Sequence, residues 1–219
     1  LLRWLHSDPT LSRVGAILFD EFHERNLLGD VALAIVKRLQ AETRPDLLAI
    51  VMSATLEARP VAAYLGGCPI LESQGRQFPV EIRYQPWDDD TDVWERAAAQ
   101  VGEIVRQTSA GDILVFMPGA YEIARTLEEI RRTLQRTLGR EQWDNVVALP
   151  LHGELPPTEQ DRVFIPTPYR RVIVSTNVAE TSVTIPGIRY VVDSGLARIA
   201  RYDPERGLDT LHIEPISQA

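Results

Sequence analysis

The stretch Val14-Gly-Ala-Ile-Leu-Phe-Asp-Glu-Phe-His-Glu-Arg25 decides the fold that we expect for this chain. Its first half, 14–19, is a short apolar run of the kind that forms a strand buried on both faces. Where this run stops, two adjacent carboxylates follow, Asp20 and Glu21. In an open α/β sheet, ligands bind at the carboxyl ends of the strands, so acids at a strand end predict a site.

The alternation of short apolar runs with helical spacing continues along the chain. Further strands are expected at 47–52, 112–117, 146–150, 171–175 and 188–193, and helices at 30–41 and 121–138. Buried strands that alternate with helices predict βαβ units and therefore an α/β fold with parallel sheets. A strand-like run at 80–84 and a hairpin formed by 197–202 and 208–213 are also expected.

A domain boundary is expected near Gly75–Pro79, where glycine and proline punctuate the chain. We predict two domains, with residues 1–76 as the carboxyl-terminal part of the first and residues 77–219 as most of the second. The chain has no initiator methionine and its first residues read as mid-domain sequence, so we expect an internal piece of a longer protein.

The composition narrows the class of protein. The chain has 219 residues, of which 44% are hydrophobic and 25% charged, as in a globular protein. No apolar run approaches the ~20 residues of a membrane-spanning helix, so no membrane partner is expected. The formal net charge of −8 argues against nucleic-acid binding by bulk charge, although a local basic groove stays possible. The single cysteine, Cys68, fits a reducing, cytoplasmic compartment.

Small, polar and acidic residues follow the predicted strands. They are Asp20, Glu21 and His23, then Ser53 and Thr55, Pro118 and Gly119, His152 and Gly153, and Thr176 and Asn177. Mg²⁺ takes one or two carboxylates beside phosphates, so Asp20 and Glu21 are suited to hold a hydrated Mg²⁺. The competing interpretation makes Asp20 or Ser53 an ordinary helix cap.

Three motifs resemble the DEAH/DExH group of superfamily 2 helicases. Asp20-Glu-Phe-His-Glu-Arg25 resembles motif II, Ser53-Ala-Thr55 resembles motif III, and Val174-Ser-Thr-Asn-Val-Ala-Glu-Thr-Ser-Val-Thr-Ile185 is similar to the long motif V. Phe22 stands where the family usually has alanine, and together with 193–198 it looks most similar to the bacterial HrpB type, with the HrpA type as the near relative. We expect Phe22 to matter little, because the metal and water chemistry belongs to its two acidic neighbours.

The resemblance implies two RecA-like domains of the P-loop NTPase class, with ATP bound between them and single-stranded RNA across their top. It implies that Asp20 and Glu21 serve Mg²⁺ and that Glu21 is the base for the attacking water. His23 is implied to sense the nucleotide state, and Ser53 and Thr55 to couple hydrolysis to domain movement.

The resemblance also assigns roles in the second domain. It implies that Phe164 stacks on the adenine and that Asp193 lies near the ribose, while Glu180, Thr181 and Ser182 face the nucleotide or the strand. The residues implied to contact RNA are Pro118, Gly119, His152, Gly153, Thr176 and Asn177. The competing interpretations are a core role for Phe164 and an ordinary histidine at position 152.

The sequence contains no Gly-x-x-x-x-Gly-Lys motif to cradle phosphates, because its only lysine, Lys37, lies in a glycine-poor helical segment. We therefore expect this chain alone to be inactive and the helicase activity to belong to a longer parent. Two alternatives stay open: a catalytically silent RNA-binding or assembly module, and a DNA-directed superfamily 2 translocase. A Ser-His-Asp hydrolase is excluded because no Gly-x-Ser-x-Gly elbow is present.

Overall fold

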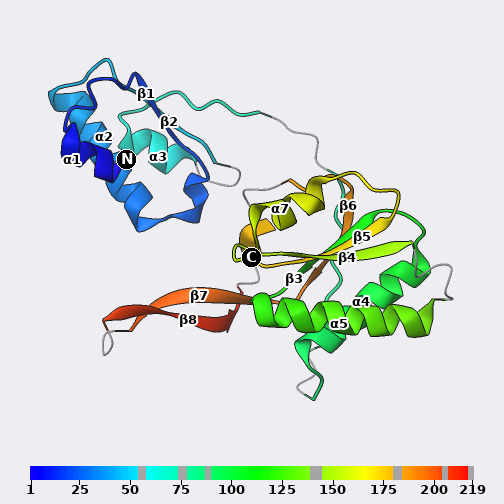
Figure 1. The fold of residues 1–219 in the computed structure, drawn as a ribbon. Coiled ribbons are helices and arrows are strands. Elements are labelled where there is room, and N and C mark those ends of the chain that lie inside the picture. The colour runs from blue at the N-terminus through cyan, green and yellow to red at the C-terminus, as the bar shows by residue number, and fades with distance from the viewer. Residues whose placement is uncertain are drawn as a thin grey trace. The chain divides into compact units, whose positions relative to one another are not determined.

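The computed structural model describes residues 1–53, 58–73, 78–86, 90–138, 145–179, 184–203 and 207–216. The chain divides into two compact units, Leu1–Ile82 and Arg83–Ala219, which are described separately (Figure 1). The boundary expected after residue 76 stays a prediction. Among the described residues, no helix combines the length and the apolar character that crossing a membrane requires.

The first unit is built on two parallel strands joined by a helix. Its elements are α1 (Leu2–Ser7), β1 (Ala16–Phe19), η1 (Phe22–Glu24), α2 (Leu27–Glu42), β2 (Leu48–Val51) and α3 (Ala58–Tyr64). The strands pair in register from Ala16 opposite Leu48 to Phe19 opposite Val51, so both carboxyl ends lie at one edge.

Helix α2 covers one face of this small sheet. The Asn26 side chain begins the helix by accepting a hydrogen bond from the backbone N–H of Leu28 at 2.8 Å. The residues that α2 buries follow helical spacing and meet Ile17 and Phe19 of β1 in one core. They are Ala32, Leu33, Val36 and Leu39. On the other face of the sheet, Leu18 and Leu48 are exposed.

Arg44 fixes the loop that leads into β1. Its guanidinium donates hydrogen bonds to the carbonyl oxygens of Leu11 at 2.6 Å and Val14 at 2.8 Å. Leu11 is fully buried and has a φ of 49°, a left-handed conformation that leucine rarely adopts. Asp46 pairs with the same guanidinium, and this hydrogen bond holds the pKa of the Asp46 carboxyl below its ordinary value.

The second unit contains a four-stranded parallel sheet in the order β4-β5-β3-β6. Its helices are α4 (Val93–Gln107), α5 (Ala120–Thr137) and α7 (Pro157–Gln160), with the short turns η2 (Asp161–Phe164) and η3 (Asn177–Ala179). Its strands are β3 (Asp112–Phe116), β4 (Val146–Leu151), β5 (Arg170–Ser175), β6 (Ile188–Asp193), β7 (Leu196–Asp203) and β8 (Leu208–Pro215).

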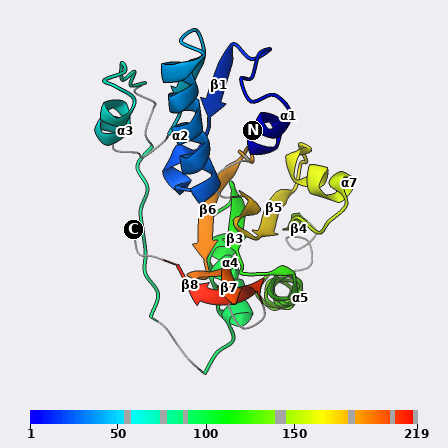
Figure 2. The same cartoon turned by 90° about the vertical axis from the view of Figure 1, so that its left-hand side faces the viewer.

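Both faces of the four-stranded sheet are covered. Ile113 and Val115 of β3 pack with buried residues of α4 and α5, which lie together on one side of the sheet (Figure 2). The alternate residue Leu114 packs on the opposite face with Val163 of η2 and Ala179 of η3. This burial on both faces is the reason that the strands read as continuous apolar runs.

The amino end of the sheet is held by buried charge. Arg171 donates its backbone N–H to Oδ1 of Asp112 and its Nε to Oδ2, both at 2.8 Å. Its Nη1 donates to the carbonyl oxygen of Val163 at 2.6 Å. These bonds tie β3, β5 and η2 together.

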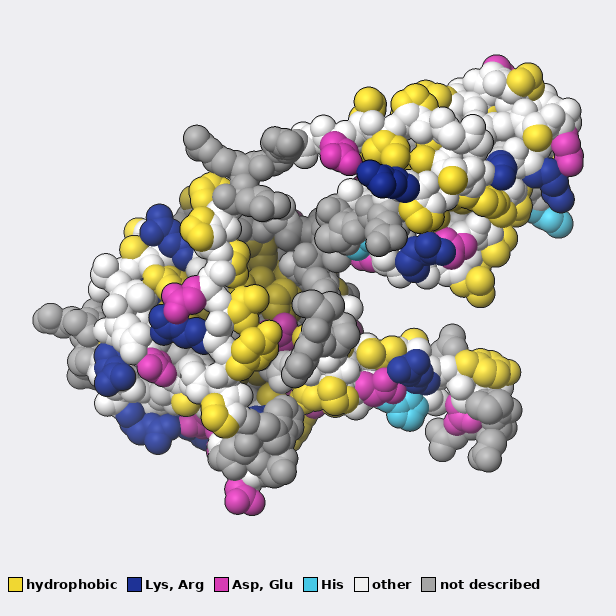
Figure 3. Space-filling model, turned by 180° about the vertical axis from the view of Figure 1, so that it is seen from behind, with side chains coloured by type: hydrophobic (Ala, Val, Ile, Leu, Met, Phe, Trp, Pro, Cys, Tyr) yellow, Lys and Arg dark blue, Asp and Glu magenta, His cyan; other side chains and the backbone are white. Residues whose placement is uncertain are grey.

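Strands β7 and β8 form an antiparallel hairpin that extends away from the sheet of the second unit (Figure 1). Arg201 and Glu214 pair across it at 2.6 Å. Figure 3 shows hydrophobic, acidic and basic side chains interspersed along this hairpin. This hairpin confirms the one that the proline and glycine between 197–202 and 208–213 predicted.

The other predicted strands and helices are present, with ends that shift by a few residues. The strand expected at 80–84 is wrong, because none of residues 78–86 lies in a strand and both Val80 and Ile82 are exposed. A β-forming composition alone is therefore not sufficient to make a strand.

Candidate functional site

Asp20 and Glu21 stand directly after β1, where the sequence predicted them. Asp20 is exposed, and its Oδ1 accepts a hydrogen bond from the backbone N–H of Glu21 at 2.9 Å. Glu21 has a φ of 49°, so its backbone is left-handed at the acid pair itself. The short helix η1 that follows has Glu21 as its N-cap residue and α2 has Asn26, so the capping interpretation of Asp20 is wrong.

The side chain of Glu21 faces His23. Oε2 of Glu21 lies 3.4 Å from Nδ1 of His23, with the two side chains 36% and 21% exposed. This distance suits an ion pair when the imidazole is protonated, although the geometry does not make a hydrogen bond. The left-handed turn thus brings the carboxylate and the imidazole together.

Phe22 anchors this turn, a role that the sequence analysis missed. Its ring is buried and packs edge-to-face on Phe19 at 6.2 Å between ring centroids. Its backbone N–H donates to the carbonyl oxygen of Met52 at 3.1 Å. The signal in the sequence is a large apolar residue within an acidic turn. A comparison of motifs does not consider this signal, because the Phe22 side chain has no group that could bind the metal or act on water.

Ser53 follows β2 at the same edge as Asp20. The backbone N–H of Met52 donates to the carbonyl oxygen of Phe19 at 2.8 Å, which continues the pairing of the strands to this point. Ser53 is exposed, and its capping role stays a prediction because 54–57 lie outside the described residues. Thr55 lies outside the described residues.

The acid pair fits the requirements of Mg²⁺. Asp20 presents an exposed carboxylate with one oxygen already oriented by Glu21, and Mg²⁺ usually keeps several waters beside one or two carboxylates. Within the described ranges, no group of three or more His, Cys, Asp or Glu side chains could form a metal cage of their own. The chemistry of this donor set therefore suits a metal that is shared with phosphates.

In the second unit, backbone hydrogen bonds join the carboxyl ends of adjacent strands. Met117 donates its N–H to the carbonyl oxygen of Ser175 at 2.8 Å, and Thr176 donates to Leu151 at 3.2 Å. The loops 117–119, 152–153 and 176–177 therefore lie side by side, as the parallel topology predicted.

Gly119 is buried between two charged side chains. A Cβ at this position would lie 2.8 Å from Oε2 of Glu122 and 3.1 Å from Cζ of Arg198. Arg198 is exposed and has no hydrogen-bond or ion-pair partner among the residues that the structure describes. The sequence analysis missed Arg198, because it belongs to β7 and reaches this edge only through the fold.

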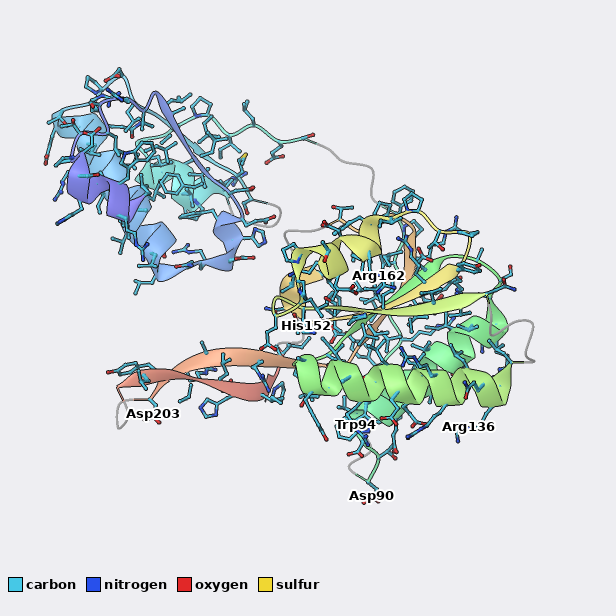
Figure 4. The ribbon with its side chains drawn as sticks, viewed as in Figure 1. Asp90, Trp94, Arg136, His152, Arg162 and Asp203 are labelled. Carbon is cyan, nitrogen blue, oxygen red and sulfur yellow. The ribbon has the colours of Figure 1, made fainter. Side chains whose placement is uncertain are left out.

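His152 lies where β4 ends (Figure 4). It is half-buried, and its Nδ1 is buried without a hydrogen-bond partner within the described parts of the chain. Gly153 beside it is exposed, and a Cβ at this position would have no neighbouring atom within 4 Å among the described residues. Thr176 is half-buried and Asn177 is exposed at the start of η3.

The predicted nucleotide residues of the second unit do not all gather at this edge. Asp193 ends β6 beside Phe116 of β3, and its Oδ1 accepts the backbone N–H of Gly195 at 2.8 Å. Phe164 is 39% exposed, so a core role for it is wrong. It follows Val163, whose carbonyl oxygen accepts a hydrogen bond from Arg171 near the start of β5. Phe164 therefore lies away from the carboxyl ends of the strands. Glu180, Thr181 and Ser182 lie outside the described residues.

Comparisons with known proteins agree with this arrangement. Residues 96–209 match the model of the helicase conserved C-terminal domain. The chain is 40% identical over its whole length to the ATP-dependent RNA helicase HrpB of Escherichia coli, of which it covers 26%. It is also 42% identical to the pre-mRNA-splicing factor ATP-dependent RNA helicase prp22 of Schizosaccharomyces pombe. That match covers 97% of this chain and 18% of prp22.

The structure is similar to the crystal structure of the Escherichia coli DEAH/RHA helicase HrpB, with a TM-score of 0.85 and 40% sequence identity. The similarity covers 99% of this chain and 27% of the HrpB chain. This likeness confirms the RecA-like α/β fold class and the DEAH/DExH resemblance that the motifs predicted. The chain spans about a quarter of the length of HrpB. The chain belongs to the helicase family that the conserved C-terminal domain defines.

Proposed function

We propose that the full-length protein carrying this sequence is an ATP-dependent RNA helicase. It couples the hydrolysis of Mg-ATP to translocation on single-stranded RNA or to its remodelling. The observation that supports this most is the grouping of the predicted motif residues at strand ends, in a chain that is 40% identical throughout to an ATP-dependent RNA helicase.

The first unit supplies the hydrolytic chemistry in this proposal. Asp20 and Glu21 would hold a hydrated Mg²⁺, which would neutralise charge on the phosphates of ATP. Glu21 orients the attacking water and accepts its proton. His23, whose Nδ1 lies 3.4 Å from Oε2 of Glu21, senses the nucleotide state. Ser53 and Thr55 couple hydrolysis to movement.

The second unit supplies contacts to the RNA backbone. The proposed contacts, at Pro118–Gly119, His152–Gly153 and Thr176–Asn177, address the RNA backbone and read no base sequence. Beside the carboxylate of Glu122, Arg198 adds an exposed cation next to Gly119 that can meet a phosphate, although the whole chain is acidic. Phe164 stacks on the adenine, and Glu180, Thr181, Ser182 and Asp193 serve the nucleotide.

A cytoplasmic location completes the proposal, in line with a single cysteine that is exposed and unpaired.

The test is the ATP hydrolysis of the full-length protein with Mg²⁺, measured alone, with single-stranded RNA and with DNA of the same sequence. We expect RNA to stimulate hydrolysis more than DNA does, and EDTA to abolish it. Equal or greater stimulation by DNA would instead establish a DNA-directed translocase. RNA binding without any hydrolysis would establish a catalytically silent module.

A further inference from the structure

Two aromatic residues occupy the first turns of α4 and α5. Trp94 and Tyr121 are each the second residue of their helix, and their rings meet edge-to-face with centroids 6.0 Å apart and an interplanar angle of 89°. Helix α5 begins directly after Gly119, at the carboxyl end of β3. Side chains on a helix lean toward its amino terminus, so the Tyr121 ring leans toward this edge of the sheet.

The Trp94 ring forms a fixed support for Tyr121. Trp94 is half-buried beside α5, and the guanidinium carbon of Arg125 lies 5.6 Å from the centroid of its ring (Figure 4). Arg125 is on α5, one turn beyond Tyr121. The tryptophan is therefore held by the same helix that presents the tyrosine, and an edge-to-face pair of this kind adds stability beyond simple burial.

Tyr121 itself remains 63% exposed. Its ring is thus packed on one side and open to solvent on the other, in a residue that has only two side-chain torsions to fix on binding. A flat aromatic surface with these properties is the stacking platform that proteins use for unpaired bases, because every base has a π-face. Gly119 lies between the carboxylate of Glu122 and the guanidinium of Arg198. Arg198 is exposed and has no ion-pair partner among the described residues, so it supplies a cation that can meet a phosphate of a polyanionic ligand at this edge.

We infer that Tyr121 stacks on a base of the single-stranded RNA whose backbone passes Gly119. The inference rests on the proposed function and adds to it a contact with the bases, where the other contacts address only the backbone. It requires no preference for one base sequence, since stacking tolerates every base.

The test uses the full-length protein with Tyr121→Leu, which keeps apolar volume but removes the flat ring, and with Tyr121→Phe, which keeps the ring. Tyr169→Leu is the matched control, because Tyr169 is 45% exposed just before β5, at the opposite edge of the sheet. Binding is measured to a uridine oligonucleotide and to an abasic ribose-phosphate oligonucleotide of equal length, each over a range of salt concentrations.

We expect Tyr121→Leu to weaken binding of the uridine oligonucleotide by roughly 5- to 150-fold, with no change for the abasic one. Tyr121→Phe and Tyr169→Leu should bind as the unaltered protein does, and the salt dependence should stay the same. Equal losses on both oligonucleotides, or no loss on either, would overturn the inference while the proposed function stands. Failure of the unaltered protein to bind single-stranded RNA would overturn the proposed function itself, and the inference with it.

Discussion

The backbone N–H of Phe22 donates to the carbonyl oxygen of Met52 at 3.1 Å, which joins the turn after β1 to the end of β2. Glu21 precedes this bond on one side and Ser53 follows it on the other. The positions of these two residues relative to each other are therefore fixed by a backbone contact, and the Phe22 ring holds that contact in the core of the first unit.

Replacing Phe22 by alanine should destabilise the first unit, even though alanine is the residue that the DEAH motif usually carries here. The Phe22 ring is 8% exposed, so Phe22→Ala leaves a cavity worth about 3–5 kcal/mol. Phe22→Leu keeps most of the volume and should cost about 1.5 kcal/mol or less. Native-state hydrogen exchange of β1 and β2 in the full-length protein measures both. Equal effects of the two variants would contradict a packing role.

Asp112→Ala should destabilise the second unit strongly. The substitution removes the carboxylate that pairs with the Arg171 guanidinium. The Asp112 side chain is 13% exposed and the Arg171 side chain is 8% exposed. Removing one partner of a buried ion pair costs about 3–5 kcal/mol. The control is Glu128→Ala, since Glu128 pairs with Arg132 on the exposed face of α5 and such pairs contribute about 0–1 kcal/mol. Exchange rates of the β3 and β5 amides report the difference, and similar rates in the two variants would refute it.

Arg198→Gln should weaken RNA binding by lowering its electrostatic component. A lost phosphate contact reduces the slope of log K against log salt by about 0.7 for a single strand. Arg201→Gln is the control, because Arg201 is on the same strand but already pairs with Glu214. Titrations at several salt concentrations separate the two variants. An unchanged slope for Arg198→Gln, or the same change for Arg201→Gln, would remove Arg198 from the site.

Much of this fold could be predicted from the sequence because its strands are buried on both faces. The runs at 113–117 and 172–174 are apolar throughout, and chain order with parallel pairing then determines which loops share an edge. The sequence therefore predicts that Gly119 and Thr176 lie at the same edge of the sheet. The motif at 20–25 likewise follows a strand that its own sequence defines.

The remaining features depend on contacts between residues far apart in the chain. Arg44 contacts the loop at Leu11, and Arg198 lies next to Gly119. The residues adjacent in sequence to either arginine form no motif that would predict these contacts. Phe22 was judged by the chemistry of its neighbours, whereas its role is packing. The run at 80–84 has β-forming residues, but strand formation also requires a partner that composition does not supply.

The central claim is that Glu21 acts on the attacking water, and Glu21→Gln in the full-length protein tests it most directly. The substitution keeps size and one oxygen but removes the charge and the basicity, whereas Glu24→Gln makes the same change at an exposed position of the same turn.

Steady-state ATP hydrolysis and ATP affinity are measured on both variants in the presence of single-stranded RNA. The account predicts that Glu21→Gln lowers kcat by roughly 10²–10⁴-fold with ATP affinity changed less than about tenfold, and that Glu24→Gln turns over normally. Turnover of Glu21→Gln within about threefold of the unaltered protein would contradict it, because a general base contributes far more than that.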